Sequence, residues 1–130
     1  MGTIAENITQ IREQMNDAAR KAGRDPSEIL LCAATKMNDA DRVKEAVAAG
    51  VDCCGENRVQ ELTAKLGENA YAGAPVHFIG HLQRNKVRQV VGKVDLIQSV
   101  DRTELLEALQ AEARRQGIRQ EILLEVNIGG

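Results

Sequence analysis

Aromatic residues are almost absent from this sequence. Phe78 is its one phenylalanine and Tyr71 its one tyrosine, and it has no tryptophan, so aromatics make up 2% of 130 residues. Binding modules that stack bases or Pro-rich peptides on aromatic side chains are therefore excluded. An excess of positive charge is also missing, because 28% of the residues are charged and the formal net charge is -2. Nucleic acid is accordingly not an expected partner.

Targeting signals and paired cysteines are lacking as well. The N-terminal segment "MGTIAENITQ" lacks the basic residues followed by an apolar stretch that are typical of a signal peptide. No run approaches the roughly 20 apolar residues that span a bilayer. Cys32, Cys53 and Cys54 are an odd number without CxxC spacing, and all lie in apolar segments. We therefore expect reduced core thiols, no metal site, no membrane partner and a cytoplasmic protein.

An amphipathic helix is predicted over residues 3–22. Thr3 and Glu6 form a capping box, and apolar residues then recur at helical spacing until Gly23 and Pro26. From residue 29 onward, short apolar runs alternate with helical stretches. The predicted strands are 29–35, 51–57, 76–81, 96–100 and 121–128, and the predicted helices are 39–49, 57–66, 85–92 and 103–116.

This alternation predicts an α/β fold with a parallel sheet covered by helices. At 130 residues we expect one domain, 1–130, in which the strands and helices of 29–130 follow the first helix. The pattern leaves open whether the sheet is open or curled. A dinucleotide-binding sheet is poorly supported, because "ATKMNDAD" after the first strand contains no glycine.

Polar residues stand where the predicted strands end. In parallel α/β folds these ends meet on one face, where chemistry is usually found. The candidates are Lys36, Glu56 with Asn57, His81, Ser99 with Asp101, and Asn127. Ordinary roles are also open: Asn57 and Asp101 could cap helices, and His81 could be a surface histidine. The basic run Arg84, Lys86, Arg88 and Lys93 is interpreted as a solvated face, with anion binding as the alternative.

Lys36 is the strongest of these candidates. It closes the apolar run "LLCAATK", and no helix C-terminus is near to use its charge. In a mostly apolar site at the strand ends, loss of solvation favours the neutral amine, which is a nucleophile towards an aldehyde. Schiff-base chemistry or anion binding is therefore expected at Lys36.

Five motifs carry a resemblance to a known family. In chain order they are "LLCAATK", "GENRVQE", "HFIGHLQRNKV", "SVD" and "LLEVNIGG". Together they closely resemble the pyridoxal phosphate homeostasis proteins, the YggS/PROSC family, over essentially the whole chain. The resemblance implies a TIM barrel like the N-terminal domain of alanine racemases, with pyridoxal 5'-phosphate held as a Schiff base. Lys36 matches the family's cofactor lysine, and Asn57 matches the asparagine beside the cofactor.

The same resemblance implies a non-catalytic carrier or regulator of this coenzyme. Family members are much longer, and a complete barrel typically needs about 250 residues. We therefore expect an N-terminal fragment, truncated after about five parallel strands. The phosphate-gripping Gly/Ser-rich loops and the arginine that faces the pyridine nitrogen would be missing, which weakens binding. Unpaired sheet edges would favour self-association.

Other functions stay open at this point. A racemase-like enzyme needs a second acid/base, and Tyr71 is predicted in a loop outside the strand-end set. A class I aldolase-like enzyme would use Lys36 on its substrate, with His81 or Asp101 moving the proton. A half-barrel interaction module without a ligand is the third possibility, and a freely exposed Lys36 would favour it.

Overall fold

The computed structural model describes residues 2–129, in which strands and helices alternate after a first long helix. The helices are α1 (Ile4–Lys21), α2 (Ala40–Ala48), α3 (Val59–Gly67) and α4 (Thr103–Gln116), with 3-10 turns η1 (Pro26–Glu28) and η2 (Arg84–Gln89). The strands are β1 (Cys32–Ala34), β2 (Cys53–Glu56), β3 (Val76–Phe78), β4 (Leu96–Val100) and β5 (Ile122–Leu124).

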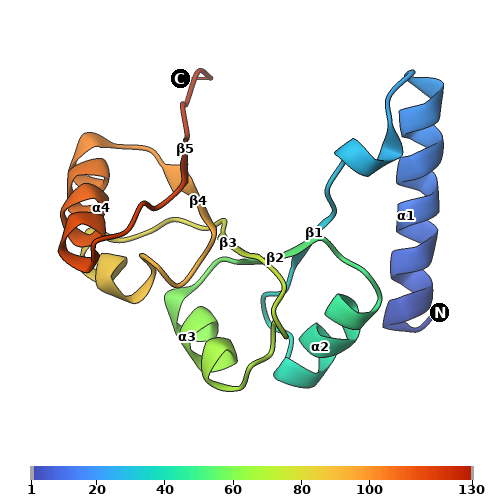
Figure 1. The fold of residues 1–130 in the computed structure, drawn as a ribbon, viewed down its shortest axis with the longest axis horizontal. Coiled ribbons are helices and arrows are strands. Elements are labelled where there is room, and N and C mark those ends of the chain that lie inside the picture. Colours follow the sequence, from blue (N-terminus) through green and yellow to red (C-terminus); the bar gives the residue numbers. More distant parts are fainter. Residues whose placement is uncertain (1, 130) are drawn as a thin grey trace.

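The strands form one parallel sheet in the order β1-β2-β3-β4-β5. Cys32 lies opposite Cys53, and Gly55 lies opposite His77 in the register. Figure 1 shows the strands following an arc, with α2, α3 and α4 on its outer side and α1 beyond the β1 edge. A doubly wound sheet would reverse its strand order and carry helices on both faces, whereas consecutive strands with outer helices are typical of a (β/α) barrel. The predicted α/β class is confirmed.

The main core lies between the convex face of the sheet and the outer helices. Successive strand residues point to opposite faces, so Phe78 and Ile97 face the helices while His77 and Gln98 face the concave side. Phe78, Ile97 and Leu62 of α3 are fully buried. Burial of each such side chain contributes about 1.5–3 kcal/mol. The packed convex face thus supports the concave face and the strand ends.

Helix α1 begins at the predicted capping box and is anchored to the sheet through Asp52. The Thr3 side chain accepts from Glu6 N, as predicted. Arg12 Nη2 lies 2.8 Å from Asp52 Oδ2, and the same oxygen accepts from Leu31 N at 2.6 Å. One carboxylate therefore joins α1, the start of β1 and the start of β2. Within residues 2–129, no helix has the length and apolarity needed to cross a membrane.

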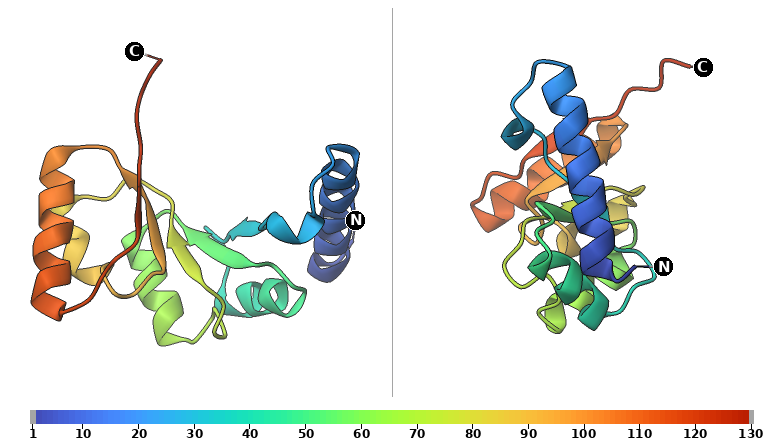
Figure 2. Two further views of the ribbon diagram at one scale, coloured as in Figure 1. Left: turned by 45° about the horizontal axis from the view of Figure 1, so that its top comes forward. Right: turned by 90° about the vertical axis from the view of Figure 1, so that its right-hand side faces the viewer.

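Several predicted elements differ from those observed. The helix predicted at 85–92 is the 3-10 turn η2, because β-branched Val87 and Val90 disfavour an α-helix and Gly92 adopts a left-handed φ of 79°. The strand predicted at 121–128 is paired only over Ile122–Leu124. Glu125 N still donates to Val100 O at 2.8 Å, and the segment after it extends away from the other strands, where no described strand pairs with it (Figure 2).

Candidate functional site

Lys36 lies just beyond the carboxyl end of β1 and is exposed. The following residue, Met37, adopts a left-handed φ of 62°, which costs a non-glycine residue about 1–3 kcal/mol. Two hydrogen bonds hold this turn: Met37 N donates to Glu61 Oε1 at 2.7 Å, and Asn38 Nδ2 donates to Lys36 O at 3.0 Å. The backbone that presents the amine is therefore fixed, and the side chain is exposed.

Asn57 and His81 lie at the next two strand ends and line one cavity of about 270 Å³, together with Lys86. Asn57 does not cap α3, because the N-cap residue is Arg58. Its Oδ1 is buried and has no hydrogen-bond partner among the described residues. Asn57 therefore has an unused acceptor at this edge of the sheet. Because a buried amide oxygen without a partner costs about 1–3 kcal/mol, a hydrogen-bond donor from a ligand would be favourable there. His81 is exposed at the same cavity.

Gly80 holds the β3 end against the β2 end. A Cβ atom at Gly80 would lie 2.7 Å from Asn57 Cα and 2.9 Å from Asn57 C, both immovable backbone atoms. We expect Gly80→Ala to lower the free energy of unfolding by about 1–3 kcal/mol, because the two strand ends must separate. Chemical denaturation measures this change.

The matched control for this substitution is Gly67→Ala in the last turn of α3. No atom lies within 4 Å of a Cβ at Gly67, so this variant should be as stable as the parent or slightly more stable. Equal stability of both variants would show that the contact between Gly80 and Asn57 is loose.

A buried polar network lies on the helix side of the sheet, directly behind the first two strand ends. It consists of Thr35, Glu56, Lys65 and Tyr71, and we call it the Glu56 network. Glu56 Oε2 accepts from Thr35 Oγ1 at 2.7 Å, from Lys65 Nζ at 2.9 Å and from Tyr71 OH at 2.6 Å. Lys65 Nζ also donates to Thr35 O at 2.7 Å. Thr35 and Glu56 immediately precede Lys36 and Asn57, so the network fixes the backbone of both candidates.

Tyr71 was predicted in a loop away from the strand ends, but its hydroxyl is part of this buried network. Burial and the hydrogen bond to Glu56 raise the pKa of Tyr71 far above its usual range. Its ring lies on the helix side, whereas alternation from Ala34 places Lys36 on the concave side. Tyr71 therefore cannot serve as an acid or base beside the Lys36 amine. Lys65 and Tyr71 gave no strand-end signal in the sequence, since they come from α3 and the turn after it.

The other predicted site residues come from the ends of β4 and β5 and do not line the cavity of Asn57 and His81. Ser99 follows Gln98, which faces the concave side, so the alternation of side chains along β4 directs Ser99 towards the helices. The buried Ser99 Oγ has no hydrogen-bond partner among the described residues.

Asp101 does not cap α4, whose N-cap is Arg102. Arg102 donates to Asp101 at 2.6 Å, and this bond lowers the Asp101 pKa. Asn127 lies in the segment beyond β5, where it accepts from Gly129 N. The roles predicted for Ser99 and Asn127 stay predictions.

The cysteines only partly match the predicted core positions. Cys53 and Cys54 are buried, but Cys32 is exposed, because β1 is the edge strand of the sheet. Burial raises the pKa of Cys53 to about 12 and that of Cys54 to about 11. Both thiols are therefore protonated at neutral pH, and neither is a nucleophile.

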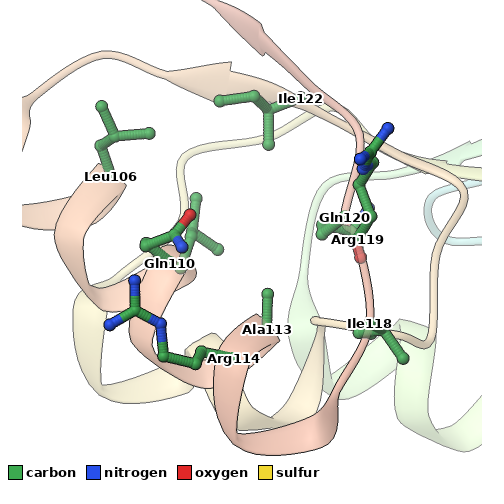
Figure 3. Close-up of a pocket in the computed structure, with 9 residues that line it drawn as sticks. Leu106, Gln110, Ala113, Arg114, Ile118, Arg119, Gln120 and Ile122 are labelled. Carbon is green, nitrogen blue, oxygen red and sulfur yellow. The ribbon is translucent and has the colours of Figure 1, made fainter.

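A further pocket of about 310 Å³ lies between α4 and the segment leading into β5 (Figure 3). Its apolar part is formed by Leu106, Leu109, Ala113, Ile118 and Ile122, and Arg114 and Arg119 lie at its rim. This is the amino end of β5, the opposite edge from Lys36 and Asn57. The lining contains no carboxylate, thiol or histidine, so it does not offer acid–base or nucleophilic chemistry.

Comparison with known proteins identifies the family. The family model described as "Alanine racemase, N-terminal domain" matches residues 2–130. The chain belongs to this family. The barrel-type fold expected from the motifs is therefore confirmed, and the five strands are the first part of the family's barrel architecture.

Relatives within the family share a common description. The chain is 40% identical to a pyridoxal phosphate homeostasis protein of Pseudomonas aeruginosa and 38% identical to one of Aquifex aeolicus, over 100% and 96% of its length. The matches cover 56% and 55% of those proteins, so the chain spans about half the length of the curated relatives. The structure of PipY from Synechococcus elongatus with PLP bound is 35% identical and matches with a TM-score of 0.82, over 97% of this chain and 55% of PipY.

Proposed function

We propose that this chain binds pyridoxal 5'-phosphate through the amine of Lys36 and takes part in homeostasis of this coenzyme without catalytic turnover. The observation that carries the proposal is the placement of Lys36 and Asn57 at neighbouring strand ends of a fold similar to PLP-bound PipY. When bound, the coenzyme supplies an aldehyde that condenses with an amine to a Schiff base and releases water. Lys36 supplies the amine from a fixed turn.

The residues at this edge fit such a ligand. The unpaired Asn57 Oδ1 offers an acceptor to a ring hydroxyl, Lys86 offers positive charge and His81 a ring nitrogen at the same cavity, whose lining does not include Lys36. The chain matches 56% of the Pseudomonas aeruginosa relative, and the resemblance implies that the phosphate-gripping loops belong to the remaining part. Each lost charge-assisted hydrogen bond is worth about 1.5–3 kcal/mol, so we propose weaker binding than in the longer relatives.

A ligand-free interaction module is the second candidate, because Lys36 is exposed as that hypothesis expects. An aldolase-like enzyme would use exposed His81 for proton transfer, because Asp101 accepts from Arg102 at 2.6 Å. A titration separates these functions. A ligand-free interaction module should show no saturable change in absorbance when pyridoxal 5'-phosphate is added, whereas the proposed carrier should show one. The aldolase would also turn over a carbonyl substrate.

The contribution of Asn57 gives a specific test of the proposed pocket. We expect Asn57→Ala to weaken binding of pyridoxal 5'-phosphate about tenfold, which corresponds to one lost hydrogen bond of about 1.4 kcal/mol. An absorbance titration at equilibrium measures the dissociation constant. Asn85→Ala, at an exposed position of η2, is the control and should bind like the parent. Equal affinity of both variants would exclude Asn57 from the site.

We further propose that the chain associates with a second copy through the β5 edge. Leu124 is 66% exposed and Val126 is 73% exposed. An unpaired strand edge with apolar side chains favours strand pairing, and a charge on it opposes pairing. We expect Leu124→Lys to reduce association several-fold in sedimentation velocity measured over a range of concentrations. Leu106→Lys, on an exposed position of α4, should leave association unchanged; a monomeric parent chain would contradict the proposal.

A further inference from the structure

Three potential metal ligands lie together on the concave face, at the amino end of the sheet. They are Cys32 of β1, Cys53 of β2 and His77 of β3, and one ligand atom of each lies within 4.8 Å of the other two. Cys32 and Cys53 are the first residues of β1 and β2 and direct register partners, and His77 is the second residue of β3. Their sequence spacings show no metal-binding motif, because the strand register rather than a local turn brings them together.

We propose that Cys32, Cys53 and His77 form a binding site for a thiophilic divalent cation, with Zn²⁺ as the expected ion. Two thiolates and one imidazole are ligands that Zn²⁺ prefers. Around a tetrahedral ion with Zn–S bonds of about 2.3 Å, the two sulfur atoms would lie about 3.8 Å apart. The observed cluster reaches this spacing by small side-chain movements, which the exposed Cys32 side chain permits.

A neighbouring side chain orients the histidine. Gln98 Nε2 and His77 Nδ1 lie 2.9 Å apart. With the Gln98 amide rotated so that its oxygen accepts from Nδ1–H, the lone pair of His77 Nε2 is free for a metal. Metal-ligating histidines almost always have such a partner on their second nitrogen. The fourth coordination position stays open to water.

The proposed metal site is separate from the Lys36 edge. Cys32, Cys53 and His77 each lie four residues before Lys36, Asn57 and His81, which follow the carboxyl ends of β1, β2 and β3. The two sets of residues therefore lie towards opposite ends of the first three strands. A metal at the amino end would cross-link the first three strands and stabilise the half of the sheet that carries Lys36. Metal displaces the thiol protons when it binds, so buried Cys53 need not be ionised beforehand.

Cobalt spectroscopy tests the site directly. The reduced, chelator-treated 130-residue chain is titrated with Co²⁺, and then with Zn²⁺ to displace it. We expect one equivalent of Co²⁺ to give thiolate charge-transfer absorption and the visible bands of a tetrahedral ion, and Zn²⁺ to remove both. Cys32→Ser and His77→Ala should each weaken Co²⁺ binding at least tenfold. Cys32 is exposed, so its serine variant should keep the parent's circular dichroism spectrum.

Cys54→Ala is the matched control. Cys54 is adjacent in sequence but faces the helix side, so this variant should bind Co²⁺ as the parent does. Binding without thiolate absorption, or binding that persists in Cys32→Ser and His77→Ala, would overturn the proposal. Loss of binding in Cys54→Ala alone would also overturn it, since the wrong face of the sheet would then hold the ion. These outcomes do not depend on pyridoxal 5'-phosphate, so this test and that of Lys36 succeed or fail separately.

Discussion

Glu56→Ala is expected to lower the free energy of unfolding by about 3–5 kcal/mol, the cost of removing one partner from a buried ion pair. Glu56 is fully buried, and its Oε2 accepts hydrogen bonds from Thr35, Lys65 and Tyr71. Without it, the buried Lys65 amine keeps, among residues 2–129, Thr35 O at 2.7 Å and Glu61 Oε1 at 3.4 Å as acceptors. Urea denaturation followed by circular dichroism measures the change.

Glu68→Ala is the control for the Glu56 network. Glu68 is an exposed acid at the end of α3, so its removal should change stability by less than about 0.5 kcal/mol. We expect the parent chain to fold as one domain over 1–130, and its urea denaturation should therefore show one transition. If Glu56→Ala and Glu68→Ala unfold at the same urea concentration with equal slopes, Glu56 does not hold the strand ends together.

Lys36→Arg is expected to abolish the saturable absorbance change that pyridoxal 5'-phosphate produces in the parent chain. Arginine keeps the positive charge but has no amine that can condense with an aldehyde. The variant therefore separates Schiff-base formation from simple anion binding, which would survive the change. An absorbance titration with pyridoxal 5'-phosphate is the measurement.

The control for this variant is Lys44→Arg, at an exposed position of α2. It should titrate like the parent, because Lys44 lies on a helix outside the sheet. If Lys36→Arg keeps the parent's spectrum and affinity, the proposed role of Lys36 is wrong.

The sequence predicted the fold well because its signals there are local. The capping box at Thr3 and Glu6, and the alternation of apolar runs with helical stretches, depend on neighbouring residues. Predictions failed where the exposure of a side chain or the length of a strand depends on neighbouring strands and on the layer that covers the sheet. Cys32 is exposed because β1 is the edge strand of the sheet, and the last strand is short because it has one described partner.

The candidate site shows the same limit. The strand-end rule found Lys36 and Asn57, because the rule follows from parallel topology alone. Lys65 and Tyr71 were missed because their contact with Glu56 joins α3 and its following turn to β2. The cluster of Cys32, Cys53 and His77 was missed because only the register of three strands creates it. Long-range contacts of this kind leave no pattern in one sequence.

Borohydride reduction followed by peptide mapping tests the central claim most directly. The chain is incubated with pyridoxal 5'-phosphate, reduced to fix any Schiff base, digested and analysed by mass spectrometry. The account predicts one dominant phosphopyridoxyl group on the peptide that contains Lys36, and its disappearance in Lys36→Arg. Modification spread evenly over Lys36, Lys44, Lys86 and Lys93 would contradict it, because the strand end would then give Lys36 no advantage over a surface lysine.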